Sequence, residues 1–184
     1  MPFLELGRKA ERIMAEADAL LMIRQEPTLR NRVLLTVLYG GGLRISDVCG
    51  LRWRDLTARD EAGQATVFGK DGKTRAVLLS AATWKGLLAL RGEAPDNAPV
   101  FLSRKGGALD PNAVHRVVKA AAARAGLRSK VSAHWLLHAH ASHSLDRGAP
   151  IHLVQATQGH ASVATTGRYL HARPSESSAR FLGA

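Results

Sequence analysis

QATVFGKDGKTRAVLLS, residues 64–80, is the stretch that decides the fold class. Its apolar residues recur at every second position on both sides of Asp71-Gly72, and this spacing is typical of two antiparallel strands. Asp-Gly is a favoured two-residue turn because glycine readily adopts the positive φ angle that such a turn needs. The sequence therefore predicts a β-hairpin in an otherwise helical chain.

Helical spacing of apolar residues, bounded by proline and glycine, predominates outside the hairpin. Before the hairpin we expect helices over residues 4–25, 30–39 and 45–51. After it, residues 92–112 are rich in proline and glycine and predict a loop. The other expected helices cover residues 81–91, 113–125, 132–143, 151–157 and 161–171. The predicted fold class is α+β, mainly α-helical with a small antiparallel β-sheet, in a single domain over residues 1–184.

The composition favours a soluble protein with a polyanionic partner. Lys and Arg number 26 against 15 Asp and Glu, which gives a formal net charge of +11, and 46% of the residues are hydrophobic. Excess charge of this size opposes compaction, so a nucleic-acid partner is favoured over a merely solvated basic surface. The single cysteine, Cys49, excludes an internal disulfide and suits a reducing compartment. With no secretory signal and no membrane-spanning run, we expect a cytoplasmic protein.

The stretch SAHWLLHAHASH, residues 132–143, contains four histidines and raises the question of a metal site. His134 and His138 are one helical turn apart, but Trp135 stands where the zinc peptidase motif requires glutamate. No cysteine pair completes a ligand set, and the nearest acid, Asp146, lies beyond the motif. The sequence therefore predicts no metal and no cofactor.

Polar groups with a weak structural explanation occur in four segments. Arg44 follows three glycines and begins a helix, where a cation opposes the helix dipole and a planar guanidinium suits a phosphate. The hairpin turn is expected to project Lys70, Lys73 and Arg75, although solvated turns of this kind are common. The histidine stretch is the third segment. The fourth, QGHASVATTGRYLHARP, contains Tyr169, which by itself could be a half-buried aromatic residue.

Taken together, these segments resemble the catalytic domain of the tyrosine recombinases, also called the phage integrase family. The resemblance covers residues 35–173 and rests on the order GLRxSD, GK hairpin, HxLxH and GHxSxxTTxxY. It implies a site-specific DNA recombinase or integrase that cuts and rejoins DNA through a 3′-phosphotyrosine intermediate. The residues that it implies as catalytic are Tyr169, Arg44, Lys70, His134 and His160, with Asp47 and His138 in support.

Two positions depart from the family motifs. Leu137 occupies the place of the second arginine in HxLRH, so half of the expected phosphate clamp is missing. Gln158 precedes Gly159-His160, where the family usually has an apolar residue. We therefore expect impaired cleavage. The alternative is a DNA-binding protein on the same fold that no longer cuts, and a type IB topoisomerase is a weaker third interpretation.

The resemblance also implies double-stranded DNA as the partner. The expected DNA contacts are Lys73, Arg75, Arg104 and Lys105. We expect a monomer in the free state and a homotetramer on paired DNA sites, with residues 174–184 as a tail that could be exchanged between protomers. Only about 30 residues precede the matched region, so the family's N-terminal core-binding domain is expected to be absent.

Overall fold

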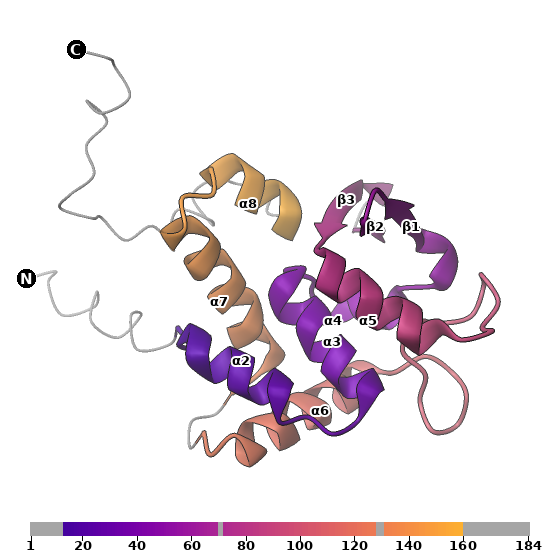
Figure 1. The fold of residues 1–184 in the computed structure, drawn as a ribbon, viewed down its shortest axis with the longest axis horizontal. Coiled ribbons are helices and arrows are strands. Elements are labelled where there is room, and N and C mark those ends of the chain that lie inside the picture. The colour runs from indigo at the N-terminus through magenta and orange to yellow at the C-terminus, as the bar shows by residue number, and fades with distance from the viewer. Residues whose placement is uncertain (1–12, 70–71, 128–130, 160–184) are drawn as a thin grey trace, which may run out of the picture.

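The computed structural model describes residues 13–69, 72–127 and 131–159. Figure 1 shows one small sheet at the edge of a group of helices. The helices are α2 (Glu16–Arg24), α3 (Leu29–Gly40), α4 (Ile45–Gly50), α5 (Ala81–Arg91), α6 (Pro111–Arg124), α7 (Ala133–Asp146) and α8 (Ile151–Gln158). A 3-10 turn, η1 (Trp53–Asp55), precedes the strands β1 (Leu56–Arg59), β2 (Ala62–Phe68) and β3 (Thr74–Leu79).

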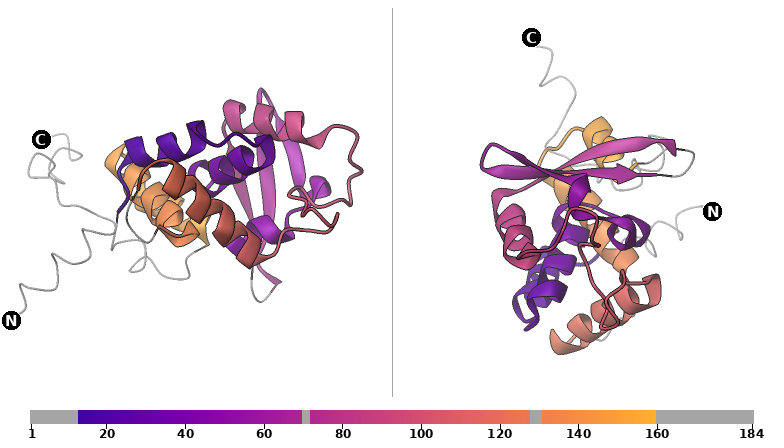
Figure 2. Two further views of the ribbon diagram at one scale, coloured as in Figure 1. Left: turned by 90° about the horizontal axis from the view of Figure 1, so that it is seen from below. Right: turned by 90° about the vertical axis from the view of Figure 1, so that its right-hand side faces the viewer.

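The three strands form an antiparallel sheet in the order β1-β2-β3. In the predicted hairpin, Phe68 pairs with Thr74 and Gly63 pairs with Leu79. Side chains alternate between the two faces of a strand, so the buried face carries Ala65, Val67, Val77 and Leu79. Figure 2 shows most of the helices on one side of this sheet. The sheet therefore contributes one apolar face to a core that helices complete.

Two elements stand at the centre of the packing. The helix α3 lies against α2, α5 and α7, and its Leu34, Leu35 and Leu38 are fully buried. The helix α5 packs closely on the sheet where its Trp84 ring lies against Gly63 of β2, and a Cβ added at Gly63 would lie 2.2 Å from that ring. Glycine is required at that position because any side chain would push α5 away from β2.

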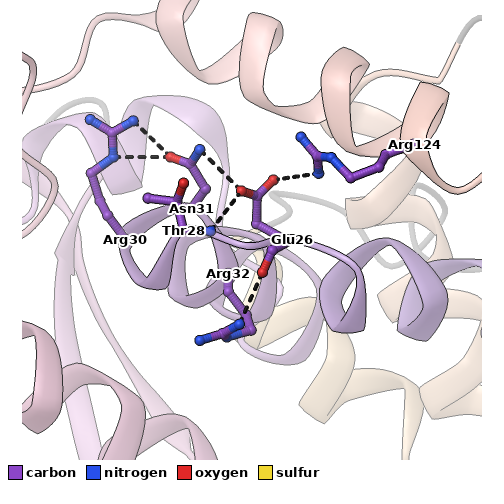
Figure 3. Close-up of polar contacts among 6 residues, drawn as sticks. All are labelled: Glu26, Thr28, Arg30, Asn31, Arg32 and Arg124. Atoms are coloured by element: carbon purple, nitrogen blue, oxygen red, sulfur yellow. Dashed lines mark hydrogen bonds and ion pairs between the residues drawn. The ribbon is translucent and has the colours of Figure 1, made fainter.

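A buried carboxylate joins the α2–α3 turn to the end of α6 (Figure 3). The side chain of Glu26 is 1% exposed, and its Oε2 accepts a 2.8 Å bond from the Arg124 guanidinium. Its Oε1 accepts from the backbone N–H of Thr28 at 3.2 Å and from Asn31 at 3.4 Å. The Arg32 guanidinium donates to the backbone carbonyl of Glu26. A charge this buried is stable only when it is paired and hydrogen-bonded in this way.

The predicted fold class is confirmed, and the element boundaries show where the sequence patterns were insufficient. The helix expected over residues 4–25 begins at Glu16 within the described residues, and the four-residue strand β1 was missed because it is too short to show a period of two. The helix expected from residue 113 begins at Pro111, because Asp110 caps it by accepting the N–H of Ala113 at 2.7 Å. The helix expected over residues 161–171 lies outside the described residues.

Over residues 13–69, 72–127 and 131–159, none of the helices combines the length and apolar character that a bilayer crossing requires.

Candidate active site

The carboxylate of Asp47 occupies the start of α4 and binds two arginines in different ways. Its Oδ2 accepts the backbone N–H of Arg44 at 2.8 Å, an arrangement that caps the first turn of the helix. The same oxygen accepts the Arg75 guanidinium at 2.6 Å. The side chains of Arg75 and Asp47 are only 14% and 4% exposed. Asp47 was predicted to support Arg44. It does so through the backbone N–H of Arg44, while its charge is paired with the guanidinium of Arg75.

The guanidinium of Arg75 also reaches the C-terminal end of α8. Its Nε donates to the backbone carbonyl of Thr157 at 2.8 Å. The Arg44 guanidinium donates to the carbonyl of Gly159 at 3.1 Å. Carbonyls at a helix C-terminus lack partners within the helix and favour cations, which explains why two arginines converge there. The start of α4, the strand β3 and the end of α8 thus meet at one place.

Gly159 is needed for this convergence. It ends α8 in the left-handed region with φ of 65°, which glycine adopts without strain. An added Cβ would lie 3.1 Å from Nη1 of Arg75 and 3.2 Å from its Cζ. Glycine therefore permits both the turn and the close approach of the guanidinium.

Arg75 was predicted to project from the hairpin turn, and this prediction was wrong, because its side chain is only 14% exposed. Strand alternation puts Arg75 on the same face of β3 as the buried residues Val77 and Leu79. That period was visible in the sequence and would have predicted an inward arginine with an acidic partner. Lys73, by contrast, is exposed. A DNA contact by either residue remains a prediction.

The histidine pair of the third segment lies on α7. His134 is exposed and His138 is half-buried, and their ring centroids are 4.0 Å apart at an interplanar angle of 57°. Both side chains are on one face of the helix, as the spacing predicted. In the parts of the chain that the structure describes, no group of three metal-ligating side chains occurs.

Leu137, on the same helix, is 7% exposed. Its backbone carbonyl accepts a 2.8 Å hydrogen bond from Nε2 of Gln158, which is itself buried. A leucine side chain offers no hydrogen-bond donor, so Leu137 adds no positive group beside the histidine pair. The contact instead ties the end of α8 to α7.

The other two histidines of the stretch support the end of α3. Nδ1 of His140 donates to the backbone carbonyl of Tyr39 at 2.7 Å, and Nδ1 of His143 shares a 2.9 Å hydrogen bond with the Tyr39 hydroxyl. Burial lowers the pKa of His140 and raises the pKa of Tyr39. The His140 ring also fills the space beside Gly42, where a Cβ would lie 2.6 Å away. These contacts fix the loop that leads to Arg44.

Three of the predicted catalytic residues, Lys70, His160 and Tyr169, lie outside the described residues, as does the predicted tail over residues 174–184. Their neighbours in the chain, Gly69 and Gly159, are described. Within the described part, the structure brings together Arg44, Asp47 and the residue that precedes His160.

A second basic surface lies beside α6. Arg104 and Lys105, both predicted DNA contacts, line an open groove with a volume of about 570 Å³. Arg30 and Arg116, which were not among the predicted contacts, line the same groove. Arg116 could have been found from its place in the first turns of a capped helix. Arg30 could not, because the groove joins segments more than 70 residues apart.

Comparison with known proteins identifies the family. The model of the phage integrase family matches residues 7–176. The tyrosine recombinase XerC of Xanthomonas campestris pv. campestris (strain B100) is 37% identical over 171 residues, which are 89% of this chain and 52% of that protein. XerC of Myxococcus xanthus is 41% identical over 152 residues, which are 77% of this chain and 50% of that protein. The chain thus spans about half the length of these relatives.

Solved structures agree with this assignment. The XerA recombinase is 29% identical with a TM-score of 0.76, over 89% of this chain and 59% of that one. The XerH site-specific recombinase, in a pre-cleavage complex with its difH substrate, is 27% identical with a TM-score of 0.76, over 88% of this chain and 51% of that one. The order of motifs, the fold and these similarities lead to one conclusion: the chain belongs to the phage integrase family.

Proposed function

We propose that this chain is the catalytic domain of a site-specific DNA recombinase, which cuts and rejoins DNA through a covalent link to Tyr169. The observation that carries the proposal is the convergence of Arg44, Asp47 and the end of α8. Arg44 donates to the backbone carbonyl of Gly159, the residue that directly precedes His160 in the chain. A guanidinium fork of this kind suits the non-bridging oxygens of a phosphodiester.

Each assigned residue has a chemical role in the reaction. The phenol of Tyr169 has an ordinary pKa of about 10, so it must lose its proton as its oxygen attacks the phosphorus. His134 is assigned as the base that takes this proton, and its exposed imidazole is open to solvent and substrate. Lys70 would protonate the leaving 5′-oxygen, while Arg44 and His160 stabilise the charge that grows on the phosphate. The covalent link preserves the bond energy for rejoining, with no cofactor.

Leu137 leads us to propose impaired cleavage. The family's second arginine would supply a charged bidentate donor here, whereas Leu137 supplies none and is largely buried. Loss of one such donor in a transition state lowers the rate by about 10²- to 10³-fold. The second candidate function, a DNA-binding protein that no longer cuts, is favoured by this one observation.

Double-stranded DNA is the proposed substrate and partner. The formal charge of +11 and the groove lined by Arg30, Arg104, Lys105 and Arg116 support this partner. Binding through such residues releases counterions, so the affinity should fall steeply with salt. We also propose a homotetramer on paired sites, a monomer in the absence of DNA, and a cytoplasmic location.

The test is covalent capture on DNA. A bound sequence is first selected from random duplexes, and a duplex with a nick near the cleavage point is then used to trap the adduct. We expect a slowly formed adduct that Tyr169→Phe abolishes while duplex binding persists. Binding without any adduct, even after prolonged incubation, would support the non-cutting alternative, and a chain that binds no duplex would contradict both.

A further inference from the structure

We infer that Arg75 is a positioning residue, which neutralises Asp47 and thereby leaves the guanidinium of Arg44 available for a DNA phosphate. This inference rests on the proposed function, because it assigns Arg44 to the phosphate. It gives Arg75 a different role from the direct DNA contact that the sequence suggested.

The buried carboxylate of Asp47 is paired with Arg75. Its side chain is 4% exposed, and a carboxylate this buried requires a cation or several donors. Arg75 supplies that cation at 2.6 Å, while Arg44 contributes its backbone N–H at 2.8 Å. Among the described residues, Asp47 forms its ion pair with Arg75 and not with Arg44. The guanidinium of Arg44 instead donates to the Gly159 carbonyl at 3.1 Å, a neutral acceptor that a phosphate can replace.

Removal of Arg75 would change that balance. Asp47 would lose its cation in a nearly buried place and retain only the backbone N–H of Arg44 as a donor. Arg44, three positions earlier in the chain and already bonded to this carboxylate through its backbone, is the cation in reach by local rotation of its side chain. An ion pair with Asp47 would then compete with the phosphate for the same guanidinium fork. Arg75 therefore favours phosphate binding by Arg44 without touching DNA.

The second anchor explains why an arginine is needed. Nη2 of Arg75 binds Asp47 while its Nε binds the carbonyl of Thr157. A planar guanidinium holds both partners at once, whereas the single ammonium group of lysine cannot reproduce this geometry. Thr157 lies three residues before His160, so the same guanidinium links the hairpin strand to the segment that leads into the GHxS motif.

The decisive experiment measures how strongly duplex binding depends on Arg44 in different backgrounds. In the unmodified chain, Arg44→Gln should weaken binding about tenfold or more, since it removes a charged hydrogen bond to phosphate. In an Arg75→Gln background the same change should cost no more than about twofold, because Arg44 would already be held by Asp47. Lys85→Gln is the matched control: Lys85 is exposed on α5 and its loss removes the same charge, so the tenfold effect should persist. If Arg44→Gln weakens binding equally in all three backgrounds, the inference is overturned. That result is expected if Arg75 contacts DNA directly.

A rescue variant separates positioning from simple loss of folding. Asp47→Asn added to Arg75→Gln removes the charge that would capture Arg44, so the tenfold dependence on Arg44 should return. A double variant that folds but still shows no dependence on Arg44 would contradict the inference.

A readout without DNA keeps this test independent of the proposed function. The Nε–Hε signal of Arg44 in an NMR spectrum, assigned by its loss in Arg44→Lys, should move in Arg75→Gln and return in the double variant. If the chain binds no duplex at all, the proposed function fails, and this signal still shows whether Arg75 keeps Asp47 from pairing with Arg44. A signal unchanged by Arg75→Gln would overturn it.

Discussion

The side-chain amide of Gln158 donates a hydrogen bond to the backbone carbonyl of Leu137 across 2.8 Å, in the buried contact between α8 and α7. These two residues are the positions at which the chain departs from the motifs of its family. They are 21 residues apart in the sequence and in direct contact in the fold. The two departures are therefore neighbours in the fold, joined through the side chain of Gln158 and the main chain of Leu137.

Leu137→Arg should raise the rate of formation of the covalent Tyr169–DNA adduct by about 10²- to 10³-fold, since it returns a bidentate donor to the clamp. Leu137→Lys should recover less, because one ammonium group cannot hold two phosphate oxygens in a plane. The rates are measured by adduct trapping on a nicked duplex. An unmodified chain that cleaves fast, with no gain from Leu137→Arg, would show that another residue completes the clamp.

The same substitution carries a cost in stability, because Leu137 is 7% exposed. Leu137 lies outside the main apolar cluster of the described core, whereas its neighbour Leu136 is a member of it and is fully buried. Leu137→Arg should lower the unfolding free energy by about 1–3 kcal/mol, the usual cost of overpacking. Leu136→Arg should cost at least about 3 kcal/mol because it strands a charge. Urea denaturation of both variants makes the comparison, and equal costs would contradict it.

Gln158→Ala should destabilise the docking of α8 on α7. It removes the hydrogen bond to Leu137 and leaves a space in a buried contact, for a combined loss of about 2 kcal/mol in unfolding free energy. His152→Ala is the control, because His152 is exposed on the same helix and its loss should stay within about 0.5 kcal/mol. Chemical denaturation measures both, and a Gln158 variant as stable as the control would show that the bond contributes nothing.

His140 should make the stability of the protein depend on pH. Burial lowers its pKa in the folded state, against the opposing effect of its bond to the Tyr39 carbonyl. The unfolded chain therefore takes up the proton first as the pH falls, so the contribution of neutral His140 is fully present well above pH ~6.5 and declines below it. Unfolding free energies measured from pH 8 to 5 should show this decline.

His140→Gln isolates the contribution of that histidine. The glutamine amide can still donate to the Tyr39 carbonyl but does not titrate. The slope of unfolding free energy against pH below pH ~6.5 should therefore decrease by the amount that corresponds to at most one bound proton. His143, whose charge also lowers the pKa of His140, and the exposed histidines remain in both proteins. Parallel curves for the two proteins would rule out His140 as the source.

Arg124→Gln should destabilise the fold far more than loss of an exposed ion pair does. It would leave the Glu26 carboxylate, 1% exposed, without its cation (Figure 3). Breaking a buried pair costs about 3–5 kcal/mol, and because Arg124 is itself 37% exposed we expect a value near or below the low end of that range. Arg91→Gln is the control, since its partner Asp96 is 76% exposed and such pairs contribute at most about 1 kcal/mol. Similar losses for the two variants in thermal or urea unfolding would contradict this account.

The sequence by itself determined the fold class, most of the helices and the family. Those features depend on short-range patterns: a period of two around Asp71-Gly72, helical spacing elsewhere, and motifs in a fixed order. The period of two on β3 even placed Arg75 on the inner face with Val77 and Leu79, although the turn was interpreted as a set of projecting cations.

Only the tertiary structure decided what those side chains contact. Arg75 binds a carboxylate 28 residues away and a carbonyl 82 residues away, and His140 binds a carbonyl 101 residues away. The same packing divides one histidine-rich helix into a pair whose rings contact each other, His134 and His138, and a pair that supports α3, His140 and His143. Such partners cannot be predicted from local patterns, because they depend on how helices and strands pack in space, and that packing is the sum of many weak contacts between distant segments.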